Sequence, residues 1–397
     1  MSGLRKGYTT GTCAAAAAKA AAQVLKSGVM SQELASQSGV RGQEGSPANQ
    51  RFAGAEESGV DRKIEVEIVL PKGEIVKFEA YIKDVGEDYA VASVIKDAGD
   101  DPDVTGGAEI VARVTLKESG VRSQKSGVGR DNEKQIFIKG GIGVGVVTKP
   151  GLQVPAGEPA INPVPRRMIK DAVKEVLGDA TVEVTIEVPD GEKLAEKTFN
   201  PRLGIRGGIS IIGTTGIVEP MSLEALKATV QCEIDVAVAE VGNRKSEFGS
   251  QVPKIYFSPG KIGEDALRRI FGDIRVVQTS NFVGFALQYA KDRGVKEVVF
   301  GGHPGKLAKI LMGYYDTHSR NSPQATRFVS EFLGIEGEFN TVEEIIEAIG
   351  KRQEATGFDR LAEEIAKKIS EDFSFIHTGV YLFDMKKTLI GEGRWDG

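Results

Sequence analysis

The sequence predicts two domains of different architecture. An N-terminal α+β domain is expected over residues 1–205, and a doubly wound, mostly parallel, Rossmann-like α/β domain over residues 206–397. The chain has 397 residues, more than one hydrophobic core usually serves. Its first half places single helices among strands of alternating polarity, whereas its second half alternates short β-branched runs with helical segments, which is typical of a parallel sheet.

The first elements follow from local composition. A helix is predicted over Thr12–Leu25, where strong helix formers follow threonines that can cap the free amides. Residues Ser27–Asp61 are polar and lack apolar periodicity, so we expect an inserted loop without chemistry. Alternation over Ile64–Leu70 and Ile75–Ile82, around a Pro-Lys-Gly-Glu turn, predicts a β-hairpin.

The remainder of the first half continues the α+β pattern. A helix is expected from Asn162 to Leu177, because Pro163 lies just inside its start, Gly178 lies at its end, and the apolar residues between them have helical spacing. The other expected features are strands at Ala108–Leu116, Gln135–Ile138 and Thr181–Val188, a polar insertion at Ser119–Asn132, and a linker at Asn200–Gly208.

The second half predicts a sheet whose ligand loops share one edge. Strands are expected at Ile209–Ile212, Lys254–Phe257, Ile274–Val277, Glu297–Phe300 and Val380–Phe383, and helices at Leu223–Val238, Glu264–Phe271, Phe282–Arg293, Val342–Ile349 and Leu361–Ile369. Right-handed crossovers place the loops after parallel strands together, where such sheets bind ligands. Function is therefore expected at Gly213–Pro220, Ser258–Glu264, Thr279–Asn281 and Gly301–Lys306.

Composition argues against several classes of function. The net charge of −5 disfavours general nucleic-acid binding, which usually shows as a basic excess. No apolar run is long enough to cross a bilayer, and the first residues lack the apolar core of a secretory signal, so we expect a cytoplasmic protein without membrane association. Cys13 and Cys232 alone cannot build a disulfide framework, which fits a reducing compartment.

Three glycine-rich loops are candidates for binding a nucleotide-like ligand. Gly213-Thr214-Thr215-Gly216 could expose amides and hydroxyls to a ligand or form a plain tight turn, and Glu219 beyond it could bind a ribose or be an ordinary exposed acid. The second loop contributes Gly260, Gly263 and Glu264, and the third contributes Gly301 and Gly302. The third loop fails the P-loop register at Phe300 and Leu307, which disfavours ATP hydrolysis.

Histidines and arginines supply the other candidates. No two of the three histidines have the short helical spacing of a metal site, so no protein-bound metal is expected. His303 lies in a predicted ligand loop and His318 in a polar segment, where each could serve acid–base catalysis or only structure. Arg166 and Arg167 lie at a helix start, where the macrodipole opposes positive charge, so either an anionic ligand or an intramolecular carboxylate is expected nearby.

Four longer strings, taken together, resemble the cobalt-precorrin-5B C1-methyltransferase family. They are GYTTGTCAAAAAKAA at Gly7–Ala21, EPAINPVPRRMI at Glu158–Ile169, GGISIIGTTGIVEPMS at Gly207–Ser222, and GGHPGKLAKI with DTHSR within Gly301–Arg320. Their order and spacing cover nearly the whole chain, and the two polar insertions interrupt none of them.

The resemblance implies a two-domain enzyme that methylates carbon 1 of cobalt-precorrin-5B, giving cobalt-precorrin-6A, in anaerobic cobalamin biosynthesis. S-adenosylmethionine would be the cosubstrate, and cobalt would arrive only as part of the tetrapyrrole substrate. Homo-oligomers or transient contacts with other enzymes of the pathway are compatible with this function. The alternative is a non-catalytic corrinoid-binding or pathway-scaffold protein, which would not need a second, nucleotide-like pocket.

The resemblance assigns no catalytic residue, so the site is chosen from the residues themselves. His303 and His318 are the expected catalytic residues. The acetate and propionate arms of the macrocycle need polar and cationic partners, for which we select Thr9, Thr10, Arg166, Arg167, Lys306 and Arg320. Methyl transfer needs no enzyme nucleophile, because the protein must mainly align two ligands and exclude water.

Overall fold

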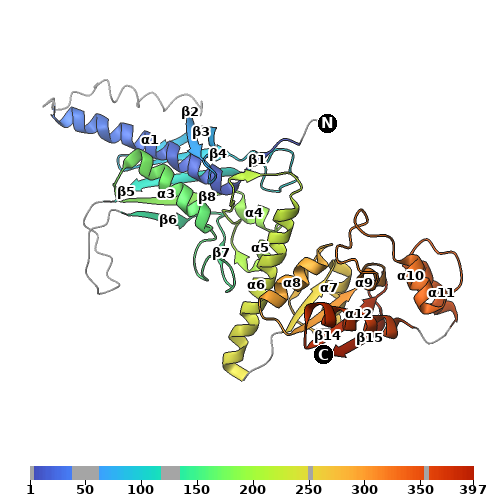
Figure 1. Ribbon diagram of the computed structural model, residues 1–397. Coiled ribbons are helices and arrows are strands. Elements are labelled where there is room, and N and C mark those ends of the chain that lie inside the picture. Colours follow the sequence, from blue (N-terminus) through green and yellow to red (C-terminus); the bar gives the residue numbers. More distant parts are fainter. Residues whose placement is uncertain (1–3, 38–61, 118–134, 249–253, 353–356) are drawn as a thin grey trace. The chain divides into compact units, whose positions relative to one another are not determined.

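The computed structural model describes residues 4–37, 62–117, 135–248, 254–352 and 357–397. The chain divides into two compact units that both contain helices and sheets, so the expected mixed α/β class is confirmed (Figure 1). Unit 1 comprises Met1–Lys149 and Gln153–Ser222, and unit 2 comprises Pro150–Leu152 and Leu223–Gly397. Residues 206–222, which we expected in the second domain, therefore group with unit 1.

Unit 1 is built on a six-stranded sheet in the order β2-β3-β4-β5-β8-β6. Its strands are β2 (Arg62–Val69), β3 (Ile75–Val85), β4 (Tyr89–Ile95), β5 (Glu109–Leu116), β8 (Val182–Glu187) and β6 (Ile136–Gly140). All neighbours are antiparallel except β8 and β6. The hairpin expected from sequence is the β2–β3 pair, whereas strand β4 was not expected.

Two helices lie side by side against this sheet, α1 (Thr10–Gln37) and α3 (Pro163–Leu177) (Figure 1). The alanines of α1 from Ala14 to Ala18 are fully buried, and their small side chains allow close packing of helix on sheet. Lys19 is buried among them, and its charge is compensated because Nζ donates to the Glu175 carboxylate at 2.7 Å.

The expected loop at Ser27–Asp61 is wrong in its first part. Helix α1 continues to Gln37, because Met, Gln, Glu, Leu and Ala in this stretch are still helix formers despite the absence of apolar periodicity. The rest of that segment, and the polar insertion at Ser119–Asn132, lie outside the described residues.

Shorter elements connect the parts of unit 1. They are β1 (Gly7–Tyr8), β7 (Val146–Val147), α4 (Gly191–Ala195), α5 (Asn200–Leu203), β9 (Ile205–Arg206) and β10 (Ile217–Val218). Strand β1 pairs with β10, and β7 pairs with β9, in two small antiparallel sheets.

Unit 2 contains a five-stranded sheet in the order β12-β11-β13-β14-β15. The strands are β11 (Lys254–Ser258), β12 (Val276–Gln278), β13 (Glu297–Gly302), β14 (His377–Phe383) and β15 (Leu389–Asp396). The first four are mutually parallel and β15 is antiparallel to β14. The parallel strands agree with the expectation from sequence, whereas β15 was not expected.

Helices cover both faces of this sheet. They are α6 (Leu223–Phe248), α7 (Lys261–Phe271), α8 (Val283–Asp292), α9 (Pro304–Leu311), α10 (Thr326–Leu333), α11 (Val342–Arg352) and α12 (Phe358–Phe373). Leu267 of α7 packs with Val299 and Tyr381 on one face, whereas the apolar residues of α6, α8, α9 and α12 form a larger cluster on the other. None of the helices in the described part of the chain is long and apolar enough to span a membrane.

The segment Ile209–Ile212 is not a strand of this sheet, contrary to expectation. Ile209 and Ile211 instead form isolated bridges with Val144 and Ile161 in unit 1, where both isoleucines are buried. A four-residue β-branched run predicts an extended, buried segment, but its partners are set by residues distant in the chain. The loop Gly213–Pro220 therefore does not follow a strand of the unit 2 sheet.

Candidate functional site

The path of the chain through the unit 2 sheet creates an edge of the kind at which open parallel sheets bind ligands. After β11 the chain crosses to β12 on one side, and after β13 it proceeds to β14 on the other side. The carboxyl ends of the adjacent strands β11 and β13 therefore form a topological switch point, the usual ligand site of an open parallel sheet. The loops that begin at Ser258 and Gly302 flank this point, as expected from sequence.

Two of the predicted glycines serve close packing at this edge. A Cβ at Gly263 would lie 2.2 Å from the carbonyl oxygen of Gly301, and a Cβ at Gly301 would lie 2.5 Å from the Leu267 side chain. The first turn of α7 thus rests directly on β13. Gly260 differs, because a Cβ there would meet no atom within 4 Å, which leaves space beside the backbone where the loop enters α7.

Glu264 is already engaged within the protein. It is 1% exposed, its carboxylate accepts a hydrogen bond from Nε2 of Gln278 at 2.5 Å, and it forms an ion pair with Arg268 at 3.1 Å. A buried carboxylate requires such partners, since burying it unpaired would be costly. These bonds order the ends of β12 and α7 and so shape the edge from within.

Lys306 presents a positive charge at the same edge. Its Nζ donates to Oδ1 of Asn281, which follows β12, at 3.1 Å. Among the described residues no carboxylate forms an ion pair with Lys306, and burial together with the nearby Lys309 ammonium lowers its pKa. A half-buried ammonium whose hydrogen bond within the described residues goes to a neutral amide is suited to an anionic ligand.

His303 is the N-cap of α9. Its Nδ1 accepts a hydrogen bond from the Gly305 amide at 3.1 Å, and Nε2 lies 3.0 Å from Oε2 of Glu343. With Nδ1 accepting, the neutral ring carries its proton on Nε2, which then donates to the Glu343 carboxylate. Both ring nitrogens are therefore occupied by bonds that stabilise the fold.

His318 has one nitrogen available. Its Nδ1 accepts from the Arg320 amide at 3.1 Å, whereas Nε2 has no hydrogen bond within the described residues. Nε2 is not among the fully buried, unpartnered side-chain atoms of the described residues, so it retains some contact with solvent. The Arg320 side chain is also exposed.

In unit 1, Thr9 and Thr10 tie the start of α1 to the segment 210–216. Thr9 Oγ1 accepts from the Thr12 amide at 3.2 Å as an N-cap, and Thr12 Oγ1 donates to the Gly216 carbonyl at 2.7 Å. Thr10 Oγ1 accepts from the Ile212 amide at 2.9 Å. The threonines expected to bind substrate thus already make structural hydrogen bonds.

The Gly213–Gly216 loop packs against these threonines. Gly213 has φ +135°, and a Cβ there would lie 2.2 Å from Thr9 Oγ1. Thr214 is exposed, and Thr215 bonds locally to Ile217. This geometry favours the interpretation of the loop as a tight turn that packs against α1.

The structure pairs Glu219 with a lysine. Its carboxylate lies 2.7 Å from Lys6 Nζ in an exposed ion pair. The contact connects the residues that flank β1 and β10.

The two adjacent arginines have different environments. Arg166 Nε donates to the Ile161 carbonyl at 2.8 Å, and its guanidinium also bonds to the Pro159 carbonyl at 3.1 Å. Glu158 lies 3.6 Å away, which is the intramolecular carboxylate allowed for above. Arg167 is exposed and has no hydrogen bond or ion pair within the described residues. Of the two, Arg167 is the one available to a ligand.

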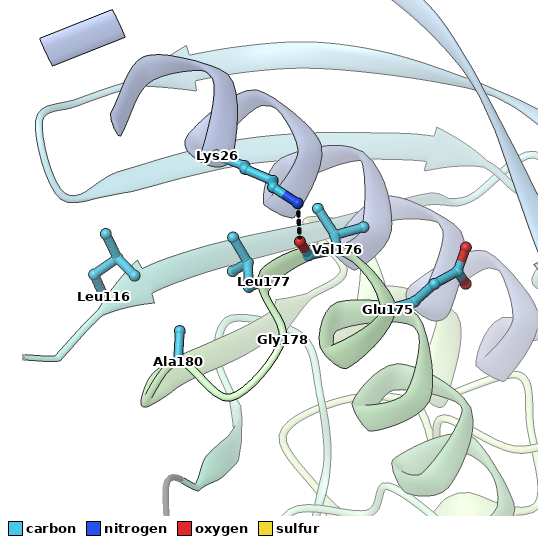
Figure 2. Close-up of a pocket in the computed structure, with 7 residues that line it drawn as sticks. All are labelled: Lys26, Leu116, Glu175, Val176, Leu177, Gly178 and Ala180. Carbon is cyan, nitrogen blue, oxygen red and sulfur yellow. Dashed lines mark hydrogen bonds between the residues drawn. The ribbon is translucent and has the colours of Figure 1, made fainter. Parts of the chain in front are cut away.

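A cavity in unit 1 is lined by none of the residues predicted to bind a ligand. It has a volume of about 380 Å³ and lies at the end of α3. Lys26 Nζ donates there to the Val176 carbonyl at 2.8 Å, the contact drawn as a dashed line in Figure 2. The lining of the cavity is largely apolar. The polar edge of unit 2 is the better candidate because of its charges and its topology.

Comparison with known proteins identifies the family. The CbiD family model matches residues 1–57 and 48–220. A cobalt-precorrin-5B C(1)-methyltransferase from Alkaliphilus metalliredigens is 37% identical over 98% of this chain and 92% of its own length. The enzyme of the same name from Desulfitobacterium hafniense is 44% identical over 79% of this chain and 68% of its own. The chain belongs to this family.

A solved structure of the cobalamin biosynthesis protein CbiD from Archaeoglobus fulgidus is also similar. It is 25% identical, covers 82% of this chain and 84% of its own, and has a TM-score of 0.35.

Three of the four strings that carried the resemblance to the CbiD family are brought together by the fold of unit 1. Gly11 lies against Pro165, where a Cβ would be 2.6 Å from Cγ, and its amide donates to the Ile212 carbonyl at 3.0 Å. The Asn162 amide bonds to the Ile211 carbonyl at 3.0 Å. The fourth string forms β13, α9 and the following segment in unit 2.

One buried residue of that fourth string was not among the candidates chosen from sequence. Lys309 is 7% exposed, and its Nζ donates to the Thr317 carbonyl and to Ser322 Oγ, each at 3.0 Å. The sequence could have indicated this residue, because the lysine lies on the apolar face of a helix, beside Leu307, Ala308 and Ile310. All three of these neighbours are buried. Such a position is rarely lysine unless the ammonium has a defined partner.

Proposed function

We propose that this chain transfers a methyl group from S-adenosylmethionine to carbon 1 of cobalt-precorrin-5B, giving cobalt-precorrin-6A. Family membership carries this proposal, since a relative of that name matches 98% of the chain. The alternative, a scaffold that only holds a corrinoid, is disfavoured because the similar proteins are named as methyltransferases.

The methyl donor is proposed to bind at the switch point of the unit 2 sheet. When bound, S-adenosylmethionine supplies an electrophilic methyl group on a sulfonium centre. The free space beside Gly260 would admit the ligand to the loop after β11, and the buried Glu264 network would hold that loop in place. The contribution of these residues is alignment, which is the main requirement of an in-line displacement.

The carboxylate arms of the substrate are proposed to bind cationic side chains. In unit 2 these are Lys306, which lacks a carboxylate partner within the described residues, and the exposed Arg320. In unit 1 the exposed Arg167 is favoured over Arg166, whose guanidinium bonds to backbone carbonyls. These cationic side chains would attract the substrate carboxylates locally, although the whole chain carries a net charge of −5.

Proton transfer by a histidine would require a change in the hydrogen bonds of its ring. The Nδ1 atoms of His303 and His318 accept amide hydrogen bonds, so base catalysis by either ring requires release of that bond or a different tautomer. Otherwise alignment and the electron-rich substrate carbon would suffice for the methyl transfer.

Purified protein incubated with methyl-labelled S-adenosylmethionine and cobalt-precorrin-5B tests the function. We expect stoichiometric label in a corrinoid product and release of S-adenosylhomocysteine. A reaction without corrinoid, and one with heat-unfolded protein, are the controls. Corrinoid binding without label transfer would instead support the scaffold alternative.

A further inference from the structure

The segment after α9 is held from within the protein by Lys309. Its ammonium donates directly to the Thr317 carbonyl and to Ser322 Oγ. Ser322 Oγ donates in turn to the His318 carbonyl at 3.0 Å. One buried ammonium thus fixes the carbonyl groups on both sides of the His318 α-carbon, one directly and the other through Ser322.

The same segment is closed by an acidic side chain. Asp316 Oδ1 accepts from the His318 amide at 3.0 Å, and Asp316 Oδ2 accepts from Nδ2 of Asn321 at 2.7 Å. The Arg320 amide orients the His318 imidazole, because it donates a hydrogen bond to Nδ1. These bonds define a loop, residues 316–322, in which the His318 backbone and Nδ1 are both held.

Burying the Lys309 ammonium costs free energy of desolvation, and this cost is high if the ammonium only holds the loop in place. Within the described residues, no carboxylate accepts a hydrogen bond from Lys309, and burial lowers the pKa of its ammonium against the opposing effect of Asp316. A neutral donor could make hydrogen bonds to the same oxygens with less desolvation. An anion bound close to the loop would interact favourably with the charge.

We propose that Lys309 is a positioning residue, and that the loop it holds presents Nε2–H of His318 as a hydrogen-bond donor to a ligand carboxylate. Because Nδ1 accepts from the Arg320 amide, the neutral ring carries its proton on Nε2, which has no hydrogen bond within the described residues. This inference rests on the proposed function, in which the carboxylate belongs to an acetate or propionate arm of the tetrapyrrole. Lys306 on α9 and the Arg320 side chain add positive charge on the same stretch of chain.

The tautomer of His318 provides a readout that is independent of activity. The chain has three histidines, so nitrogen-15 spectra of histidine-labelled protein can be assigned with His303→Asn and His377→Gln variants. In wild type we expect the neutral His318 to be protonated at Nε2. Lys309→Met keeps a similar length without donors, and it is expected to mix the two tautomers and to raise the KM for cobalt-precorrin-5B about tenfold with little change in kcat.

Two further variants make the test decisive. Lys291→Met removes an exposed ammonium from α8 and is expected to change neither the tautomer nor the KM. Ser322→Ala removes the link to the His318 carbonyl but retains the buried charge, and it replaces Lys309→Met as the deciding variant if the latter does not fold. We expect it to shift the tautomer in the same direction by a smaller amount.

The outcomes separate this inference from the proposed function. A wild-type His318 protonated at Nδ1, or a folded deciding variant that retains both the wild-type tautomer and KM, overturns the positioning role even if methyl transfer proceeds. Wild-type protein with the expected tautomer but no methyl transfer would instead contradict the proposed function.

Discussion

A Cβ atom at Gly213 would lie 2.2 Å from Oγ1 of Thr9, the residue that caps α1. Since Gly213 also has φ +135°, the position combines backbone strain with a steric conflict for any other residue. We predict that Gly213→Ala lowers the free energy of unfolding by about 2–4 kcal/mol. Urea unfolding followed by far-ultraviolet circular dichroism, with wild type and variant compared under the same conditions, measures this loss.

Gly207→Ala is the matched control for that substitution. Gly207 has φ +77°, but a Cβ there would meet no atom within 4 Å. Gly207→Ala should therefore lower the free energy of unfolding by only about 1 kcal/mol, from backbone strain alone. Equal losses for the two variants would show that the Thr9 contact is unimportant.

Arg166 and Arg167 should separate stability from substrate binding. Arg166→Met removes two hydrogen bonds to backbone carbonyls and is expected to cost about 1–3 kcal/mol of unfolding free energy. Arg167→Met should alter stability by no more than about 0.5 kcal/mol, since the side chain is exposed, while raising the KM for the corrinoid. Thermal unfolding and steady-state kinetics on both variants test this, and the reverse assignment of effects would contradict it.

His303 is predicted to contribute mainly to stability. Asparagine is a good N-cap and alanine is not, so His303→Asn should be more stable than His303→Ala by about 1 kcal/mol. Both variants should retain a near wild-type rate in single-turnover methyl transfer with saturating ligands. A fall of about a hundredfold or more in both folded variants would instead assign His303 to proton transfer.

Lys306 should make stability depend on pH in the alkaline range. Burial and Lys309 lower its pKa in the folded state, so the unfolded chain binds more protons between that pKa and the ordinary value of about 10.4. Unfolding free energy of the wild type should therefore rise relative to Lys306→Met as pH increases through this window. Urea titrations from about pH 7 to about pH 10 test the sign, with the exposed Lys291→Met as control, and a pH-independent difference would contradict it.

The two cysteines should differ in reactivity. Burial raises the pKa of Cys13 to about 12, so at neutral pH its thiol is both protonated and inaccessible. Cys232 is only partly buried, although burial and nearby acids also raise its pKa. We predict that a thiol reagent modifies Cys232 first and reaches Cys13 only when unit 1 opens. Mass spectrometry of the labelled peptides against urea concentration measures the order.

Local sequence was sufficient for most of the secondary structure and for the positions of the loops at the candidate edge of unit 2. The β2–β3 hairpin follows from alternating polarity, and the start of α3 follows from Pro163, because both signals depend on residues close together in the chain. The loops after β11 and β13 were located for the same reason. Four long strings also identified the family before any contact was known, because they combine many residues in a fixed order.

Tertiary structure alone decided the partners of those residues. Ile209 and Ile211 would be buried in either unit, and only their bridges to Val144 and Ile161 assign them to unit 1. Arg166 and Arg167 are neighbours of identical chemistry, yet only Arg166 reaches backbone carbonyls. Lys309 stands out in the sequence as a lysine on an apolar helix face, but its partners, the Thr317 carbonyl and Ser322 Oγ, are known only from the fold. Sequence thus determined which segments form elements and which family they belong to, whereas contacts between distant segments determined which side chains are occupied by the fold and which remain available to a ligand.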